Sequence, residues 1–140
     1  MNRVVITGMS AITALGDEWD EFEDNLKKKQ NAVVVDEQCK GIDGLYTNLS
    51  APITNFEKPS HYKRKKVRSM GRVSLMATRA SEKALEQSGL LDEEYFKSGL
   101  MGVAYGSSIG STSPIVGFGD LLKNGDMTGV TATSYIQMMS

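Results

Sequence analysis

Two short apolar runs, each followed at once by glycine, constrain the fold of this chain more than any other feature. Arg3 to Thr7 is rich in β-branched residues and is closed by Gly8, while Leu100 to Tyr105 runs directly into a stretch of glycines and serines. Runs of this length and composition are typical of strands buried on both faces of a sheet. The sequence therefore predicts two central strands, well separated along the chain.

Helical periodicity lies between and after these strands. Apolar residues recur every three or four positions after Asp17, a candidate N-cap, and again in a long amphipathic segment that ends at Gly89. A third helix is predicted with Ser113 as its cap, Pro114 in its first turn and Gly125 as its stop. Strands that alternate with helices predict an α/β fold, with helices layered on a mostly parallel sheet.

Two further regions carry weaker signals. Residues 31–59 lack periodicity and hold two of the three prolines, so they predict short strands and loops, with residues 32–35 the best strand candidate. Residues 134–140 resemble the first turns of an apolar helix and show no stop signal. We therefore expect the chain to end within an element.

Charge and cysteine content narrow the functional class. The 16 basic and 17 acidic side chains give a net charge of −1, which excludes the uniformly positive field of a nucleic-acid-binding protein. Every apolar stretch is too short for a signal peptide or a membrane span. The single cysteine, Cys39, has no partner for an internal disulfide, which fits a reducing, cytoplasmic setting.

The first strand and the turn after it suggest dinucleotide binding, but the glycine spacing argues against it. Val4 to Gly8 is followed by Gly16, and no glycine stands between Met9 and Leu15. The dinucleotide fingerprint needs glycines where the backbone approaches the pyrophosphate, and Ile12 occupies such a position here. This function is disfavoured.

The same residues, Arg3 to Gly16, closely resemble the opening of β-ketoacyl-acyl-carrier-protein synthases of the FabF and FabB type. Other stretches resemble that family in order and at its spacing: residues 51–56, the basic-to-Met-x-Arg stretch 65–72, and residues 102–110. Gly71 and Val73 depart from the acidic and aromatic residues usual beside the methionine of that motif, here Met70. These departures suggest a divergent branch.

The resemblance implies a fold and a reaction. Residues 1–140 would form the N-terminal portion of a thiolase-like layered αβαβα fold, with a mixed, mostly parallel sheet that is incomplete here. The complete enzyme would be an acyltransferase that joins an acyl group to malonyl-carrier protein by decarboxylative Claisen condensation, in fatty acid, polyketide or polyene biosynthesis. The resemblance implies no small cofactor and no metal.

The family's nucleophilic cysteine, two histidines and lysine are expected beyond Ser140, so we expect this segment alone to be inactive. A reactive cysteine needs a helix N-terminus or a basic neighbour that lowers its pKa, and Cys39 lies in a turn-rich region far from the family's nucleophile position. His61 matches neither histidine position of the family. We interpret it as a solvated or capping histidine.

Five cations fall within six positions, and this cluster, residues 63–68, is called the basic run below. One interpretation is that the basic run is the solvated first turn of a helix, without a binding role. The resemblance implies docking of the acidic acyl carrier protein, through steering and carboxylate pairing. The residues proposed for docking are Lys63, Arg64, Lys65, Lys66 and Arg68.

Residues 106–112, called the glycine-rich loop below, admit three interpretations. They could form an ordinary strand-to-helix connection or an anion site of backbone amides and hydroxyls. The resemblance implies a third, in which Ser108 and Ile109 lie near the interface of a homodimer and contact the acyl chain. Met138 could line the same tunnel, with core packing as the alternative.

Two other functional classes stay open. A chain-length-factor-like subunit would share the fold and the carrier-facing surface but lack the cysteine, and would serve as a non-catalytic partner in a heterodimer. An autonomous binding domain that ends at Ser140 is the other alternative. The length and saturation of the acyl chain are not encoded in these residues.

Overall fold

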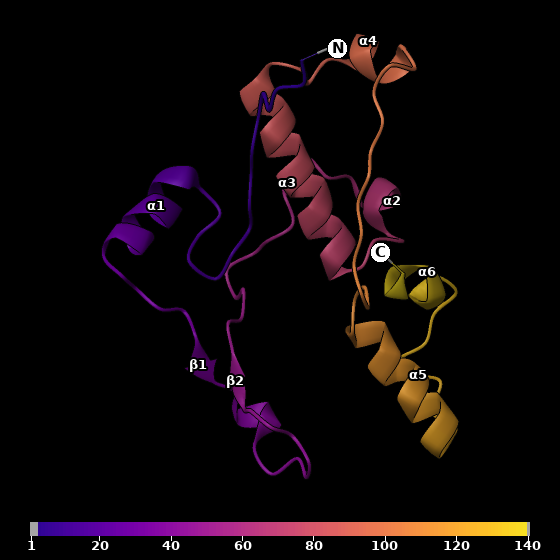
Figure 1. The fold of residues 1–140 in the computed structure, drawn as a ribbon. Helices are drawn as coiled ribbons and strands as arrows, with labels where there is room; N and C mark the ends of the chain where they lie inside the picture. The colour runs from indigo at the N-terminus through magenta and orange to yellow at the C-terminus, as the bar shows by residue number, and fades with distance from the viewer. Residues whose placement is uncertain (1–2, 140) are drawn as a thin grey trace. The chain divides into compact units, whose positions relative to one another are not determined.

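The computed structural model describes residues 3–139, the side chain of Glu93 excepted, as two compact units. Ser10–Phe56 forms one unit, and the residues up to Met9 join those from Glu57 onward in the other. Figure 1 shows the elements, which are α1 (Trp19–Lys27), β1 (Val34–Val35), the 3₁₀ turn η1 (Glu37–Cys39), β2 (Leu49–Ser50), α2 (Arg64–Val67), α3 (Arg72–Ser88), α4 (Glu93–Lys97), α5 (Ser113–Asn124) and α6 (Ser134–Met138).

The unit Ser10–Phe56 contains one amphipathic helix and one small sheet. Helix α1 begins after Glu18, not after the predicted cap Asp17, and Glu18 makes no side-chain capping bond. Strand β1 pairs antiparallel with β2, with Val34 opposite Ser50. The predicted strand over residues 32–35 is thus confirmed at its second half.

The turn after the first predicted strand is held by short-range bonds. Thr13 and Gly16 exchange backbone hydrogen bonds of 3.1 and 3.2 Å, and the Asn25 side chain of α1 donates to the Leu15 carbonyl at 2.7 Å. Gly16 adopts a φ of 135°, a backbone conformation that residues with a Cβ atom rarely adopt. These bonds close the turn onto α1.

Helix α3 is the main element of the other unit. The predicted amphipathic segment is divided, because α2 ends at Val67 and α3 begins after Gly71. Gly89 ends α3 in the left-handed conformation, at a φ of 69°, and its amide donates to carbonyls of the last turn. The predicted stop at Gly89 is confirmed, and it follows from glycine's lack of a Cβ.

The two predicted central strands differ from expectation. Both residues 3–7 and residues 100–105 are extended, yet neither forms a strand ladder with another described residue. Their side chains are open to solvent, with Val4 93% and Val103 84% exposed. A buried parallel strand needs neighbours on both edges, and the described residues do not supply them.

The first extended segment nevertheless packs on α3. A Cβ on Gly8 would overlap the backbone carbonyl of Ala84, so only glycine allows this approach. The Met9 amide donates to the Gln87 side chain at 2.6 Å. The end of the first predicted strand thus contacts α3, as expected in an α/β unit, although residues 3–7 pair with no other described strand.

The C-terminal elements confirm two sequence signals and correct others. Helix α5 begins after Thr112, so Ser113 lies inside the helix, while Gly125 ends it at a φ of 70° as predicted. Helix α4 was not predicted, although Asp92 caps it by accepting a hydrogen bond from the Glu94 amide. Helix α6 ends at Met138 and Met139 is extended, so the prediction of a helix without a stop is wrong at Met139, while Ser140 lies outside the described residues.

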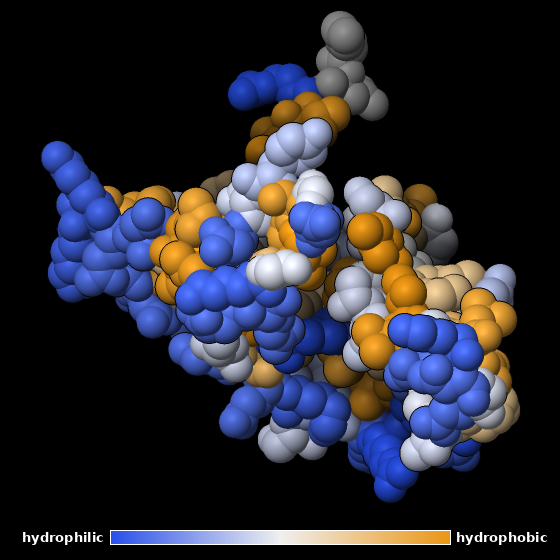
Figure 2. All heavy atoms as spheres, turned by 90° about the horizontal axis from the view of Figure 1, so that it is seen from below, coloured by the Kyte–Doolittle hydropathy of each residue, from blue (hydrophilic) through white to orange (hydrophobic). Residues whose placement is uncertain are grey.

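No aliphatic or aromatic side chain among the described residues is fully buried. Figure 2 shows apolar residues, in orange, on the visible face among polar ones. The described side chains that are buried and polar are Ser111 and Ser134, each 3% exposed. No helix in the described part of the chain has both the length and the apolar character to cross a membrane.

Candidate functional site

The basic run forms an exposed turn of helix. Lys63 is the N-cap of α2, Arg64, Lys65 and Lys66 lie within it, and Arg68 is the C-cap. All five cations are exposed, whereas Val67 is half-buried. With respect to other described residues, none of the five forms an ion pair. The run is therefore a patch of uncompensated positive charge, whose self-repulsion an anionic partner would relieve.

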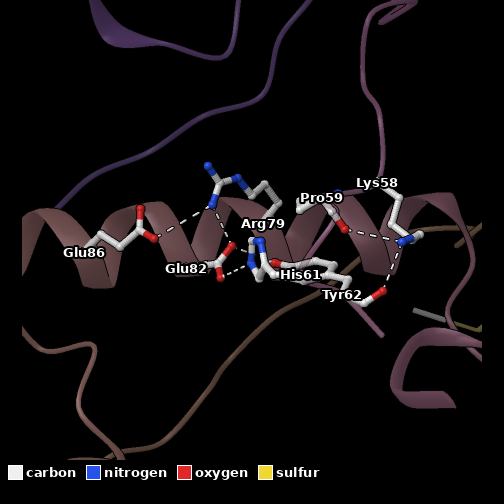
Figure 3. A network of polar contacts seen from close by, with 7 residues as sticks. All are labelled: Lys58, Pro59, His61, Tyr62, Arg79, Glu82 and Glu86. Atoms are coloured by element: carbon white, nitrogen blue, oxygen red, sulfur yellow. Dashed lines mark hydrogen bonds and ion pairs between the residues drawn. The ribbon is translucent and has the colours of Figure 1, made fainter. Parts of the chain in front are cut away.

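A polar network holds the segment just before the basic run against α3 (Figure 3). The Glu82 carboxylate lies 2.7 Å from His61 Nε2, and it accepts hydrogen bonds from the Tyr62 hydroxyl at 2.9 Å and from Arg79 Nη1 at 2.6 Å. The His61 and Tyr62 rings stack edge to face, with centroids 4.7 Å apart. The interpretation of His61 as merely solvated is therefore incomplete.

These contacts shift the pKa values of the participants. Burial and the hydrogen bond to the Glu82 carboxylate raise the pKa of Tyr62 to about 12. Burial alone would raise the pKa of Glu82, but the hydrogen bonds from Arg79, His61 and Tyr62 outweigh it and lower that pKa. The bond to Glu82 also raises the pKa of the Arg79 guanidinium. Glu82 is thus held as a carboxylate, and it anchors the residues ahead of the basic run.

A second anchor lies on the other side of the basic run, where three distant segments meet at Gly71. Ser111 Oγ accepts a hydrogen bond of 3.1 Å from the Val73 amide, and Gln137 Nε2 donates to the Arg68 carbonyl at 2.9 Å. A Cβ on Gly71 would overlap both the Ser111 hydroxyl and the Gln137 carbonyl. We call these five residues the Gly71 junction.

The glycine-rich loop packs against α6. Gly110 has a φ of 75°, and a Cβ there would overlap the Met138 carbonyl. The Gly110 amide donates to Ser107 Oγ at 3.0 Å, which tightens the loop. Ile109, 64% exposed, is therefore joined to the helix that carries the half-buried Met138.

The predicted pocket residues lie outside the hollow beside α3. Ser108 and Ile109 are exposed, and neither they nor Met138 line the hollow of about 430 Å³ that runs along α3. That hollow is lined by apolar and polar side chains of α3 and, outside α3, by Tyr62, Leu91, Phe96, Val103 and Tyr105. A wall role for Ile109 and Met138 stays a prediction.

The remaining candidates of the sequence show no catalytic arrangement. Cys39 ends η1, half-buried, with its thiol free. Among residues 3–139, no group of three or more His, Cys, Asp or Glu side chains is placed to hold a metal ion.

Sequence reasoning missed Arg79, Glu82, Ser111 and Gln137. Arg79 and Glu82 carry a local signal, because opposite charges three positions apart on a helix face one another. The contacts of Ser111 and Gln137 join residues 38 and 69 positions apart. No local pattern predicts such pairs.

Comparison with known proteins defines the class to which this arrangement belongs. The family model for the N-terminal domain of β-ketoacyl synthases matches residues 1–139. The chain belongs to the β-ketoacyl synthase family, and its fold is that of a thiolase-like ketosynthase N-terminal domain. The resemblance seen in the sequence is confirmed.

Solved structures agree with this assignment. A β-ketoacyl synthase from Burkholderia phymatum STM815 is 52% identical, with a TM-score of 0.86 over 99% of this chain and 34% of that one. The ishigamide ketosynthase/chain length factor is 20% identical, with a TM-score of 0.67 over 96% of this chain and 33% of that one, a likeness in fold alone. The chain therefore spans about a third of the length of these structures. No curated protein matches it.

Proposed function

We propose that this chain is the N-terminal portion of a β-ketoacyl-acyl-carrier-protein synthase that condenses an acyl group with malonyl-carrier protein. In that reaction a cysteine thiolate takes the acyl group and releases the carrier thiol. The malonyl thioester then loses CO₂, and its carbanion attacks the acyl-cysteine carbonyl and expels the thiolate. Family membership and 52% identity to a β-ketoacyl synthase support the proposal.

The residues in hand serve binding and positioning, not bond breaking. The observation that carries the docking role is the exposure of all five cations of the basic run, none of them paired with another described residue. An acidic carrier protein would be steered to such a patch and would pair its carboxylates with it. The nucleophile and the groups that stabilise the enolate belong to the remainder of the synthase chain.

Contact with the acyl chain is the second proposed role. Gly110 brings the loop that carries Ile109 against α6, which carries Met138. Ile109 offers apolar surface and Met138 an adaptable thioether, the side chains that suit a variable apolar ligand. In the proposed homodimer, Ser108 and Ile109 face the subunit interface.

Charge reversal tests the docking role in the complete synthase. Lys65→Glu and Arg68→Glu should lower kcat/KM at least about ten-fold with carrier-bound acyl substrates, and leave a small acyl thioester little affected. Lys123→Glu, an exposed cation on α5, is the matched control. Equal losses with both kinds of substrate would refute the docking assignment.

A non-catalytic, chain-length-factor-like partner is the alternative function. The likeness to the ishigamide ketosynthase/chain length factor is one of fold alone, which is compatible with either role. Incubating the complete protein with an acyl thioester and measuring its mass separates the two. A synthase gains one acyl group on a cysteine, and a chain-length-factor-like subunit gains none.

A further inference from the structure

Helix α3 begins without a cap of its own. Its N-cap residue, Gly71, has no side chain to accept a hydrogen bond, and the first amides of any helix lack partners within the helix. The Ser111 hydroxyl, 3% exposed, accepts the Val73 amide instead, across 38 positions. Helix α3 is therefore capped from the glycine-rich loop.

Gly71 and Ser111 form a steric pair. A Cβ at position 71 would lie 2.6 Å from Ser111 Cβ and would overlap its hydroxyl. A capping side chain on residue 71 and a serine at 111 therefore exclude each other. The Gln137 carbonyl would overlap the same Cβ, so glycine is the residue that fits position 71 in this arrangement.

The third segment of the junction is α6. Arg68 is the C-cap of α2, and its carbonyl is one of those that a helix leaves unpaired, so the Gln137 side chain satisfies a backbone group of the basic run. The residue after Gln137 is Met138, and the residue two before Ser111 is Ile109. The basic run and both proposed pocket residues are thus fixed at one point.

We propose that Ser111 and Gln137 are positioning residues, which hold the basic run in a fixed orientation relative to the loop and helix that carry Ile109 and Met138. The proposal rests on the proposed function. A carrier protein docked on the basic run must deliver its acyl chain to a wall at a set distance. The Gly71 junction sets that distance, because it ties the docking surface to the wall directly.

The test uses the complete synthase with Ser111→Ala and Gln137→Leu. Two controls remove bonds of the same kind away from the junction: Ser88→Ala loses a hydroxyl bond to the Leu85 carbonyl, and Gln87→Leu loses the carboxamide bond to the Met9 amide. Ser111→Ala should speed hydrogen exchange at the Val73 amide about five-fold. Ser111→Ala and Gln137→Leu should each raise KM for carrier-bound acyl substrate several-fold and leave kcat with a small thioester unchanged, and the controls should do neither.

The thermal midpoint separates positioning from stability. Ser111→Ala and Ser88→Ala each lose one hydroxyl hydrogen bond, so both should lower the midpoint, while only Ser111→Ala should raise KM for the carrier-bound substrate. A rise in KM that accompanies the loss of thermal stability in both variants would overturn the positioning role. If Ser111→Ala fails to fold, Gln137→Leu, at an exposed bond, carries the kinetic test.

The outcomes also separate this proposal from the docking function. Unchanged Val73 exchange in Ser111→Ala overturns the junction whatever Arg68→Glu does. A carrier-selective loss in Arg68→Glu without one in Ser111→Ala or Gln137→Leu overturns positioning and leaves docking intact. Equal losses with both substrates in Arg68→Glu refute docking, and positioning with it.

Discussion

The Nε2 atom of His61 lies 2.7 Å from Oε1 of Glu82, so the segment before the basic run is fastened to the middle of α3. Glu82 is 17% exposed and His61 57% exposed, which places the carboxylate inside the contact and the imidazole at its rim. The carboxylate is therefore the member whose loss should matter most.

Glu82→Gln should destabilise the protein at neutral pH by about 1–2 kcal/mol, because it weakens charge-assisted bonds at a partly exposed site. The folded-state pKa of Glu82 is lowered, so its contribution is present above the ordinary value of 4.5 and is lost as pH falls through the lowered value. Urea unfolding of wild type and variant against pH measures this. Glu86→Gln, whose carboxylate lies 3.9 Å from Arg79 and is 47% exposed, should have a smaller effect. A difference that does not change with pH would contradict the assignment.

Tyr62 should show the opposite pH dependence. Because its pKa is raised from 10.0 to about 12, its contribution is present below pH 10 and is lost as pH rises from 10 to 12. The ultraviolet titration of wild type minus that of Tyr62→Phe should isolate one phenol that ionises near 12. A difference centred on the ordinary value would show that the bond to Glu82 does not form.

Gly8→Ala should destabilise the protein by about 1–3 kcal/mol, because the new methyl group would meet the Ala84 backbone carbonyl, which has no freedom to rotate away. Thermal unfolding measures the change. A Gly8→Ala variant as stable as wild type would mean that residues 3–9 do not approach α3 as described.

Two glycines of one helix should respond in opposite directions. Gly119 lies inside α5, and a methyl group added there would have no described atom within 4 Å, so Gly119→Ala should stabilise by about 0.5–1 kcal/mol. Gly125 ends α5 at a φ of 70°, so Gly125→Ala should destabilise by about 1–2 kcal/mol. Thermal midpoints of the two variants, measured side by side, decide. Shifts of the same sign would contradict the C-cap.

Cys39→Ser should leave condensation intact. Cys39 is the last residue of the 3₁₀ turn η1, and its thiol has no role in the proposed chemistry. Turnover of a carrier-bound substrate by the complete synthase, before and after the change, is the measurement. A loss of more than about ten-fold, with the fold retained, would reopen its candidacy as nucleophile.

Local chemistry accounts for what the sequence predicted correctly. Gly89 and Gly125 both stop helices, because the left-handed conformation that ends a helix is set by one residue. The family resemblance was also readable, since four short motifs keep their order. The basic run is evident from composition, and in the structure all five of its cations are exposed.

Long-range pairing accounts for what the sequence did not predict. Residues 3–7 and 100–105 have the composition of strands, but a ladder depends on neighbours that composition does not name. Likewise, nothing in the sequence around Ser111 indicates that its hydroxyl accepts a hydrogen bond from the Val73 amide, 38 positions away. The sequence marks Gly71 as a departure from the motif, but its close approach to Ser111 and Gln137 is visible only in the structure.

Residues 3–7 and 100–105, which pair with no other described strand, have a consequence for the synthesis of the protein. In a synthase as long as the Burkholderia relative, about two thirds of the chain is translated after this part, which takes roughly half a minute at ribosomal speed. Throughout that interval the apolar side chains of Val4, Ile6 and Val103 stand open beside unpaired backbone. Unpaired segments of this kind recruit neighbouring chains into aggregates, so these side chains mark a part of the described surface that is prone to association.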